Sequence, residues 1–148
     1  MGAVMKIREA SLAEAASVLA RIEEFDHPET EYSLATRVRG RCPLILVAEN
    51  EGELVGVKIG YSLSETCYYS WLGGVVAEGR HNGVAQALMS TQEAWVKAQG
   101  YLELRVKSRN RYPSMLRLLL RNGYQIEHME KKDGIEDYRL HFVKSWDK

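Results

Sequence analysis

Several short segments of the chain alternate hydrophobic and polar positions with the period of a β-strand. The clearest is 55–61, where apolar side chains alternate with glycine and with Lys58. The unbroken apolar run 44–48 follows Pro43 and predicts a central strand that is buried on both faces. The same reasoning predicts further strands at 5–9, 67–76, 102–106, 124–131 and 138–143.

Helical periodicity fills the segments between these strands. Ser11 and Glu14 have the spacing of a capping box, and the apolar positions after them predict a helix that ends near residue 25. The segment 83–99 predicts a long helix that stops at Gly100, because glycine readily takes the conformation that follows a helix. Two further helices are predicted at 29–39 and 113–121.

The predicted order is strand, two helices, three strands, helix, strand, helix and two strands. This order is typical of a protein with both helices and strands (α/β in the broad sense). Within that group it fits the α+β class, in which helices cover a mixed sheet. It lacks the strict alternation of a doubly wound nucleotide-binding fold, so we do not expect that fold. The 148 residues contain no repeat and no proline- or glycine-rich linker, which predicts a single domain over 1–148.

The charge balance and the lengths of the apolar runs bear on whether the protein binds nucleic acid or a membrane. The 20 basic and 20 acidic residues give a formal net charge of zero, so no overall positive field attracts nucleic acid, and we expect no nucleic-acid partner. A basic cluster within 105–121 leaves a nucleic-acid-binding module as a third, less favoured interpretation. No apolar run approaches the ~20 residues of a membrane span, so we expect no membrane partner.

Cysteine and histidine content favours a cytoplasmic protein without a metal site. The two cysteines, Cys42 and Cys67, lie far apart and share no close spacing with histidine. Free thiols in a reducing compartment are the simplest interpretation, and the first residues lack the apolar core of a signal peptide. We therefore expect a cytoplasmic location.

The segment most informative about chemistry leads from the predicted strand 67–76 through a glycine-containing turn into the helix at Gly83. Unpaired N–H groups in the first turn of a helix, together with the helix dipole, form a site for phosphate. Gly83 lets a ligand approach the backbone closely, and Arg80 adds a fixed positive charge. The plainer alternative is that glycine only shapes the connection. Neither the Walker nor the Rossmann glycine spacing is present.

A known family motif fits this turn. The sequence reads Arg80-His81-Asn82-Gly83-Val84-Ala85, which resembles the Gln/Arg-x-x-Gly-x-Gly/Ala motif of the GNAT superfamily of acetyl-CoA-dependent N-acetyltransferases. The predicted order of elements is similar to the family's fold along nearly the whole chain. The resemblance implies a mixed, mostly antiparallel sheet of about six to seven strands flanked by about four helices. It also implies an acyltransferase with acetyl-CoA as donor substrate and no metal.

The resemblance assigns the coenzyme A contacts by position. Backbone N–H groups from 81 to 86 and the side chain of Arg80 would hold the pyrophosphate. Backbone groups of the strand would pair with the pantetheine arm, and Gly73-Gly74 suits the bulge that the family's fourth strand carries. Asn110 is available for an asparagine that many members have after the fifth strand. The donor residues implied in this way are Gly73, Val75, Val76, Arg80, His81, Asn82, Gly83, Val84, Ala85, Gln86 and Asn110.

The family's usual catalytic side chains are missing here. Many members have a tyrosine four residues before a Gly-Phe or Gly-Tyr pair, where it can protonate the leaving thiolate. Gly123-Tyr124 supplies the pair, but the earlier position is Leu119, so Tyr112 or water could take over this role. A glutamate that serves as general base in some members corresponds to Tyr69, which could orient a water, and Glu65 is the alternative. Each of these side chains could equally be an ordinary structural residue.

The acceptor site in this family usually involves the first two helices and the loop between them. That loop, 23–29, begins with Glu23, Glu24 and Phe25, and its acidic side chains favour a cationic amine, either a small molecule or a protein amine. The alternative is an ordinary solvated acidic surface. The mechanism implied is direct attack of the amine on acetyl-CoA in a ternary complex.

Two alternatives stay open. The chain could bind acyl-CoA without turnover, as a regulatory module, and the leucine at position 119 slightly favours this interpretation. The closing strand 138–143 could lie at a sheet edge and pair two copies into a homodimer.

Overall fold

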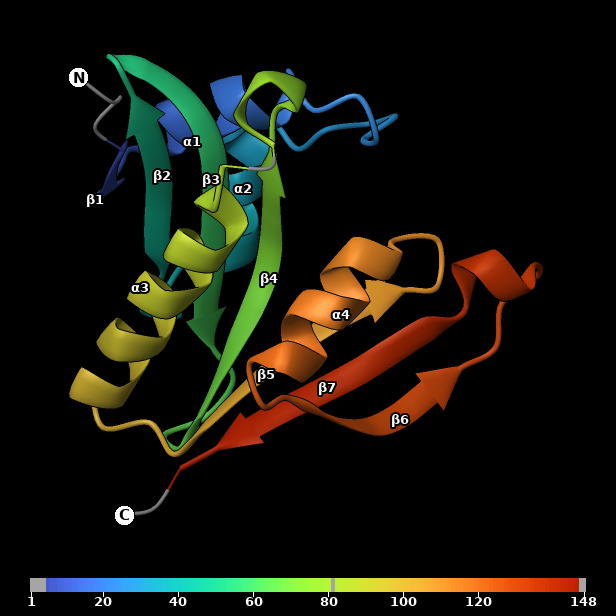
Figure 1. Ribbon diagram of the computed structural model, residues 1–148. Coiled ribbons are helices and arrows are strands. Elements are labelled where there is room, and N and C mark those ends of the chain that lie inside the picture. The colour runs from blue at the N-terminus through green and yellow to red at the C-terminus, as the bar shows by residue number, and fades with distance from the viewer. Residues whose placement is uncertain (1–4, 81, 147–148) are drawn as a thin grey trace.

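The computed structural model describes residues 5–80 and 82–146, and its elements follow the predicted order. One sheet of seven strands has α1 and α2 on one face and α3 and α4 on the other (Figure 1). In chain order the elements are β1 Met5–Glu9, α1 Leu12–Leu19, α2 Glu31–Val38, β2 Leu44–Asn50, β3 Glu53–Ser62, β4 Cys67–Val75, η1 Ala77–Gly79, α3 Val84–Ala98, β5 Glu103–Arg109, α4 Pro113–Arg121, β6 Gln125–Glu130, η2 Ile135–Asp137 and β7 Arg139–Ser145. The predicted α+β class and mostly antiparallel sheet are confirmed.

The sheet splits between its fourth and fifth strands. Its order is β1-β2-β3-β4-β5-β7-β6, and the described strands pair antiparallel except β4 with β5. These two pair only where Cys67–Ser70 lies beside Glu103–Val106, and beyond Ser70 they diverge (Figure 1). The facing edges of β4 and β5 therefore carry backbone groups that no strand within the described ranges satisfies.

A β-bulge at Trp71 lies where this divergence begins. The residues on either side of Trp71 pair with Ile59 and Gly60, which are consecutive, so Trp71 is an extra residue in β4. A bulge bends its strand and increases the local twist. The prediction of a bulge at Gly73-Gly74 is wrong, because both glycines pair in regular register with β3. The sequence of one strand does not contain its register against a neighbour.

The first two helices are shorter than predicted. α1 begins with the expected capping box but ends at Leu19. α2 begins after Thr30, whose side chain accepts a hydrogen bond from the backbone N–H of Ser33 in a second capping box. The loop 20–30 replaces the expected helix ends, and it packs against β4 at Gly74.

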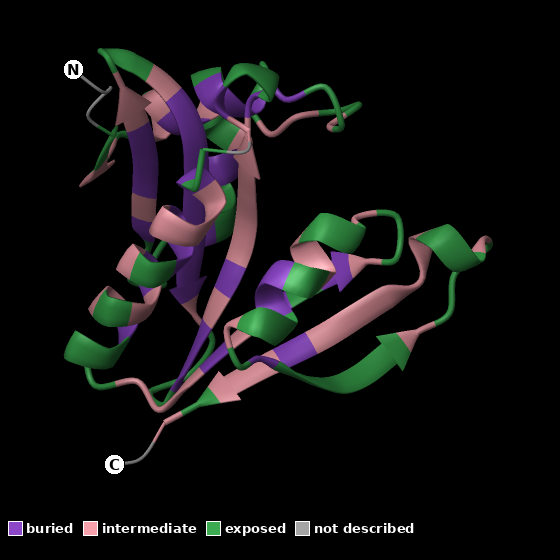
Figure 2. Ribbon diagram, in the orientation of Figure 1, coloured by how far each residue is buried: buried purple, intermediate pink, exposed green. Residues whose placement is uncertain are grey.

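The last strand does not lie at a sheet edge. β7 pairs with β5 on one side and with β6 on the other, so the expectation of an edge strand at 138–143 is wrong. After α4 the chain first runs along the outside as β6 and then returns between β6 and β5. Figure 2 shows β6 as an exposed strand, whereas buried residues concentrate in β2 and β3.

Gly60→Ala is expected to lower the free energy of unfolding by about 2 kcal/mol, measured by denaturant unfolding. A Cβ at position 60 would stand 2.7 Å from the ring of Tyr68 and 2.8 Å from the carbonyl oxygen of Tyr69. A backbone oxygen within a paired strand cannot move aside as the end of a flexible side chain can. Gly134→Ala is the control, since its close neighbour is the carboxylate end of Glu136. Equal stability of the two variants would contradict this account.

Candidate active site

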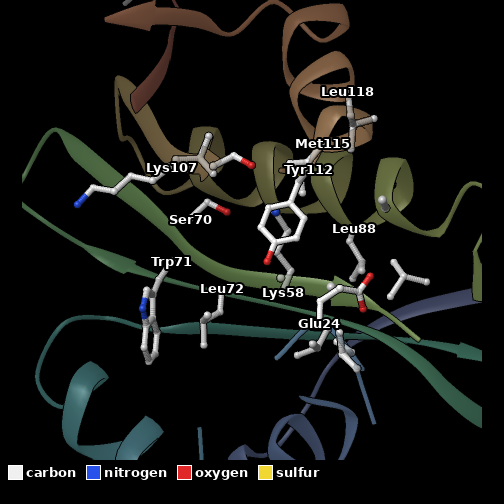
Figure 3. A pocket seen from close by; sticks show the side chains of 18 of the residues that line it. Glu24, Lys58, Ser70, Trp71, Leu72, Leu88, Lys107, Tyr112, Met115 and Leu118 are labelled. Carbon is white, nitrogen blue, oxygen red and sulfur yellow. The ribbon is translucent and has the colours of Figure 1, made fainter. Parts of the chain in front are cut away.

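The wedge between β4 and β5 opens into a cavity of about 1270 Å³. The diverging strands, the starts of α3 and α4 and the loop between α1 and α2 form its walls (Figure 3). Apolar side chains including Leu72, Leu88, Met115 and Leu118 line it beside a few polar groups. A cavity that joins a helix N-terminus to an unpaired strand edge suits a long ligand with phosphate at one end.

The N-terminus of α3 is open to this cavity. Gly83 precedes the helix with φ +76°, a left-handed conformation that favours glycine, and a Cβ there would meet nothing within 4 Å. Among the described residues, no side chain caps the first turn. The backbone N–H groups of Val84, Ala85 and Gln86 therefore keep their capacity to bind an anion.

Arg80 lies at the mouth of the cavity between two partners. Its Nε donates to the carbonyl oxygen of Val75 at 3.2 Å, and its Nη2 donates to both carboxylate oxygens of Glu24 at 2.6 Å. Burial raises the pKa of Glu24, but the hydrogen bonds from Arg80, a backbone hydrogen bond and the charge of Arg80 together outweigh this effect and leave the pKa below its ordinary value. The predicted phosphate ligand and a predicted acceptor residue thus meet in one ion pair.

The helices α3 and α4 are joined beside the cavity. The side-chain amides of Gln86 and Asn122 exchange two hydrogen bonds of 2.9 and 2.8 Å. The side chain of Gln86 is therefore committed to the fold, and only its backbone N–H group is available to a ligand.

The sequence matches one family model over residues 9–124, which is more than half of the chain. That model describes the acetyltransferase (GNAT) family. The chain belongs to the GNAT acetyltransferase family. The resemblance in the turn before Gly83 and the predicted fold are thereby confirmed.

Solved structures with low sequence identity share the GNAT fold of this chain. Ard1 from Thermoplasma volcanium is 22% identical, with a TM-score of 0.83 over 97% of this chain and 99% of that one. The ribosomal-protein-S18-alanine N-acetyltransferase from Escherichia coli is 14% identical, with a TM-score of 0.83 over 96% and 94%. A GNAT family acetyltransferase from Elizabethkingia anophelis with acetyl-CoA bound is 14% identical, with a TM-score of 0.77 over 96% and 98%. No curated protein matches the sequence significantly.

Most of the donor residues expected from GNAT proteins gather around the cavity. Its lining includes Gly73, Val75, Arg80, Gly83, Val84, Ala85 and Gln86. Val76 is a correction: it is fully buried, its N–H donates to the carbonyl of Val55, and its own carbonyl accepts from Gly79. With both backbone groups used inside the fold, Val76 has none left for a ligand.

Two other expected donor residues, Asn110 and Asn82, lie outside the cavity lining. Asn110 is outside the cavity lining, and its side-chain amide donates to the carbonyl of Ile135 at 2.9 Å, so it fixes the segment before β7 instead. Asn82 is exposed and also outside the lining. His81 lies outside the described residues.

The two candidate bases occupy different environments. Tyr69 lines the cavity, where its ring makes an edge contact with Tyr61 at 5.4 Å between centroids. Burial raises the pKa of Tyr69, which makes its phenolate less accessible at neutral pH and leaves the phenol better suited to orienting a water. Glu65 is exposed in the turn before β4 and is not part of the cavity lining, so the structure does not support it as a base.

The residue before α4 brings a phenol into the cavity, whereas Leu119 does not face it. Leu119 is buried in the core, and the helix instead turns Met115 and Leu118 toward the cavity. Tyr112 directly precedes α4 and enters the cavity with its hydroxyl directed at the strands (Figure 3). It therefore reaches the wedge from a different position than the usual GNAT tyrosine.

The acidic loop contributes to the cavity from Glu24 onward. Glu24 and Phe25 line it, as do Asp26 and Glu29. Glu23 is a correction, because it is exposed and lies outside the lining.

Lys58 is a cavity residue that the sequence did not predict. Lys58 occupies a polar position of the alternating strand β3, yet only 6% of its surface is exposed, and it lines the cavity (Figure 3). Its face of β3 is covered by α3, which approaches closely because positions 56 and 60 are glycine. Glycine two residues before and after a lysine was the available signal for a buried face.

Neither a metal centre nor a membrane helix emerges from the described part of the chain. Within residues 5–80 and 82–146, no three side chains of His, Cys, Asp or Glu gather as a metal site requires. In the same ranges no helix is both long and apolar enough to cross a membrane.

Proposed function

We propose that this GNAT protein transfers an acetyl group from acetyl-CoA to an amine by direct attack in a ternary complex. One observation carries the proposal: a single cavity joins the open N-terminus of α3 to the unpaired edge of β4. The first feature suits a diphosphate and the second suits an extended amide-bearing chain. A molecule with both parts, such as coenzyme A, fits this arrangement.

The donor is expected to lie along β4. The N–H groups of Val84, Ala85 and Gln86, with the guanidinium of Arg80, would bind the pyrophosphate. The pantetheine amides would pair with β4 as an added strand, because the edge that faces β5 lacks a strand partner beyond Ser70 in the described residues. We expect the N–H of Gly73 to hold the acetyl carbonyl oxygen.

The chemistry then depends on placement and on a small number of polar groups. The amine nitrogen attacks the acetyl carbon, and the negative charge that develops on its oxygen is stabilised by the Gly73 amide. An ordinary alkylammonium must first lose a proton, which costs about 4 kcal/mol at pH 7.4. Tyr69 would assist by orienting a water that accepts this proton. Tyr112 lines the cavity from the side of α4 and would border the acetyl group there.

The acceptor is expected to be a cationic amine. Asp26 and Glu29 line the cavity mouth beside the ion pair of Glu24 and Arg80, which gives the loop a negative balance. The Escherichia coli relative is named for a protein acceptor, ribosomal protein S18, and a Bacillus cereus neighbour for IAA. The fold thus accommodates acceptors of different size, and the acidic loop favours positive charge here.

A panel of amines assayed for thiol release from acetyl-CoA tests the proposal. We expect release with polyamines, amino sugars or lysine-containing peptides and little release with neutral or acidic amines. The leucine at position 119 favours a second function, acyl-CoA binding without turnover. Binding of acetyl-CoA with no thiol release from any amine would support that alternative and overturn acetyl transfer.

A further inference from the structure

Lys58 carries an ammonium group that the fold does not neutralise. No hydrogen bond or ion pair to its Nζ occurs among residues 5–80 and 82–146, and its surface is only 6% exposed. It lines the same cavity as the β4 edge and the start of α3 (Figure 3). An unpaired charge in such a place is costly and calls for a function, because buried cations are normally paired.

The neighbours of Lys58 on the adjacent strands are uncharged. Its register partners on β2 and β4 are Leu46 and Gly73, neither of which carries charge. Two other polar side chains near this face, Ser70 and Gln92, are buried without a hydrogen-bond partner among the described residues. Ser70 lines the cavity together with Lys58, whereas Gln92 lies next to Gly60 and outside the lining.

Glu93 is the acidic residue whose charge raises the pKa of Lys58, but its carboxylate is bound to other partners. Glu93 on α3 accepts hydrogen bonds from the hydroxyl of Tyr124 at 2.6 Å and from Nζ of Lys144 at 2.9 Å. From α4 and β5, the titratable groups that share the cavity with Lys58 include Tyr112 and Lys107. None of these forms an ion pair with Lys58.

The ammonium of Lys58 lies beside Gly73. A Cβ at position 73 would stand 3.4 Å from Nζ of Lys58, which is van der Waals contact, so the lysine head borders this glycine on the face of β4 that α3 covers. The N–H of Gly73 is the group expected to hold the acetyl carbonyl oxygen. The sulfur of a bound thioester is one bond from that carbonyl carbon, which brings it within reach of the lysine.

We propose that Lys58 is a catalytic residue that protonates the leaving sulfur of coenzyme A. The inference rests on the proposed acetyl transfer. As the new N–C bond forms and the C–S bond breaks, the electron pair of the C–S bond stays on sulfur and takes a proton from Nζ. The products are the thiol and neutral Lys58. The nitrogen, positively charged once the N–C bond has formed, gives a proton to water and becomes the neutral amide. Water then returns one proton to Lys58, and the proton that the ammonium lost before the attack remains in the solvent.

The acidity of Lys58 suits this task. Burial lowers the pKa of Lys58, and the charge of Glu93 offsets only part of this lowering, so the pKa is about 8. An ordinary thiol has a pKa near ~8.5, so proton transfer between the two is nearly balanced. A lysine with an unshifted pKa would be a much weaker acid. Lys58 therefore supplies what Leu119 cannot.

Proton release on binding tests the contact without turnover. Free coenzyme A is titrated into the protein at about pH 7.5 by calorimetry in buffers of different ionisation enthalpy, with acetyl-CoA as the matched ligand that has no thiol. We expect the wild type to release a fraction of a proton with coenzyme A beyond any released with acetyl-CoA, because the bound thiol ionises beside the ammonium. Lys58→Met should lose this difference. Lys107→Met, a lysine in the same cavity, should keep it.

Steady-state kinetics distinguish a lysine that donates a proton from one that acts only through its positive charge. With an active amine, kcat of the wild type should fall as pH rises above about 8, and Lys58→Met should lie about 100-fold lower without that decline. Lys58→Arg should keep the proton release on binding but stay slow, because a guanidinium does not give up its proton in this range. KM for acetyl-CoA should change far less than kcat in both variants.

Distinct results would overturn each level of the argument. If the wild type does not bind coenzyme A at all, the proposed function and the role of Lys58 fail together. If it binds and Lys58→Met releases the same protons as the wild type, only the assignment of Lys58 fails. An acetyl group found on Lys58 by mass spectrometry after incubation with acetyl-CoA would also overturn it, since the lysine would then be a nucleophile.

Discussion

Lys58→Met is expected to raise the free energy of unfolding at neutral pH by about 3 kcal/mol. The pKa of Lys58 is about 8 in the folded protein against an ordinary 10.5, because burial disfavours the charged form. Each unit of this difference corresponds to about 1.4 kcal/mol of penalty on the folded state. Methionine has a similar length and no charge, so it fills the same space without that penalty.

The effect has a defined pH window. Between pH values of about 8 and 10.5 the unfolded chain holds the Lys58 proton and the folded protein releases it. Stability rises with pH wherever the unfolded state binds more protons, so the wild type should gain stability through this window. The gap between Lys58→Met and the wild type should therefore be full below pH 8 and shrink as pH approaches 10.5.

Denaturant unfolding at about pH 7 and about pH 10 measures this gap. Comparing variants at the same pH removes the contribution of other groups that titrate in the same range. Lys107→Met is the control, because Lys107 is exposed and should change stability little at either pH. A Lys58→Met protein that is less stable than the wild type, or a gap that does not vary with pH, would show that the ammonium is not desolvated.

Lys58 illustrates what the sequence could not reveal. Alternation in 55–61 correctly predicts β3, but it says nothing of what covers the face that carries Lys58. That face is buried because α3 covers it, and α3 begins over 20 residues later in the chain. The period of the alternation shows only which residues share a face of a strand. What lies against that face is decided by tertiary packing.

The sequence correctly predicts the features that depend on residues close together in the chain. The capping box at Ser11, the order of strands and helices and the helix start at Gly83 each depend on neighbouring residues, and all are confirmed. The bulge at Trp71 depends on the register between two strands. The pairing of Arg80 with Glu24 joins positions 56 residues apart, so no local pattern contains it.

Arg80→Ala is expected to weaken acetyl-CoA binding by about 10- to 100-fold. Under the proposed function the guanidinium forms charge-assisted hydrogen bonds to the pyrophosphate, and each such bond contributes about 1.5–3 kcal/mol. The loss should shrink as salt rises, because both partners lie at the cavity mouth where charges are screened. Calorimetric titration at two salt concentrations measures both effects. Unchanged affinity would exclude Arg80 as a phosphate ligand.

Glu24→Gln should shift the affinities for the two substrates in opposite directions. Glu24 holds Arg80 through both carboxylate oxygens at 2.6 Å, so an incoming diphosphate must displace it. Removing that competitor should tighten acetyl-CoA binding a few-fold, a modest effect because both side chains are over a third exposed. Once displaced, Glu24 is free to attract a cationic amine, so Glu24→Gln should also raise KM for the amine.

The combination of both substitutions separates competition from simple damage. If Glu24 acts on acetyl-CoA only by occupying Arg80, then Arg80→Ala/Glu24→Gln should bind acetyl-CoA as weakly as Arg80→Ala alone. The gain from Glu24→Gln would thus vanish without Arg80. A gain that persists in the double variant would mean that Glu24 repels the phosphates directly. A loss of acetyl-CoA affinity in Glu24→Gln alone would mean that the carboxylate positions Arg80 for the phosphate rather than competing with it.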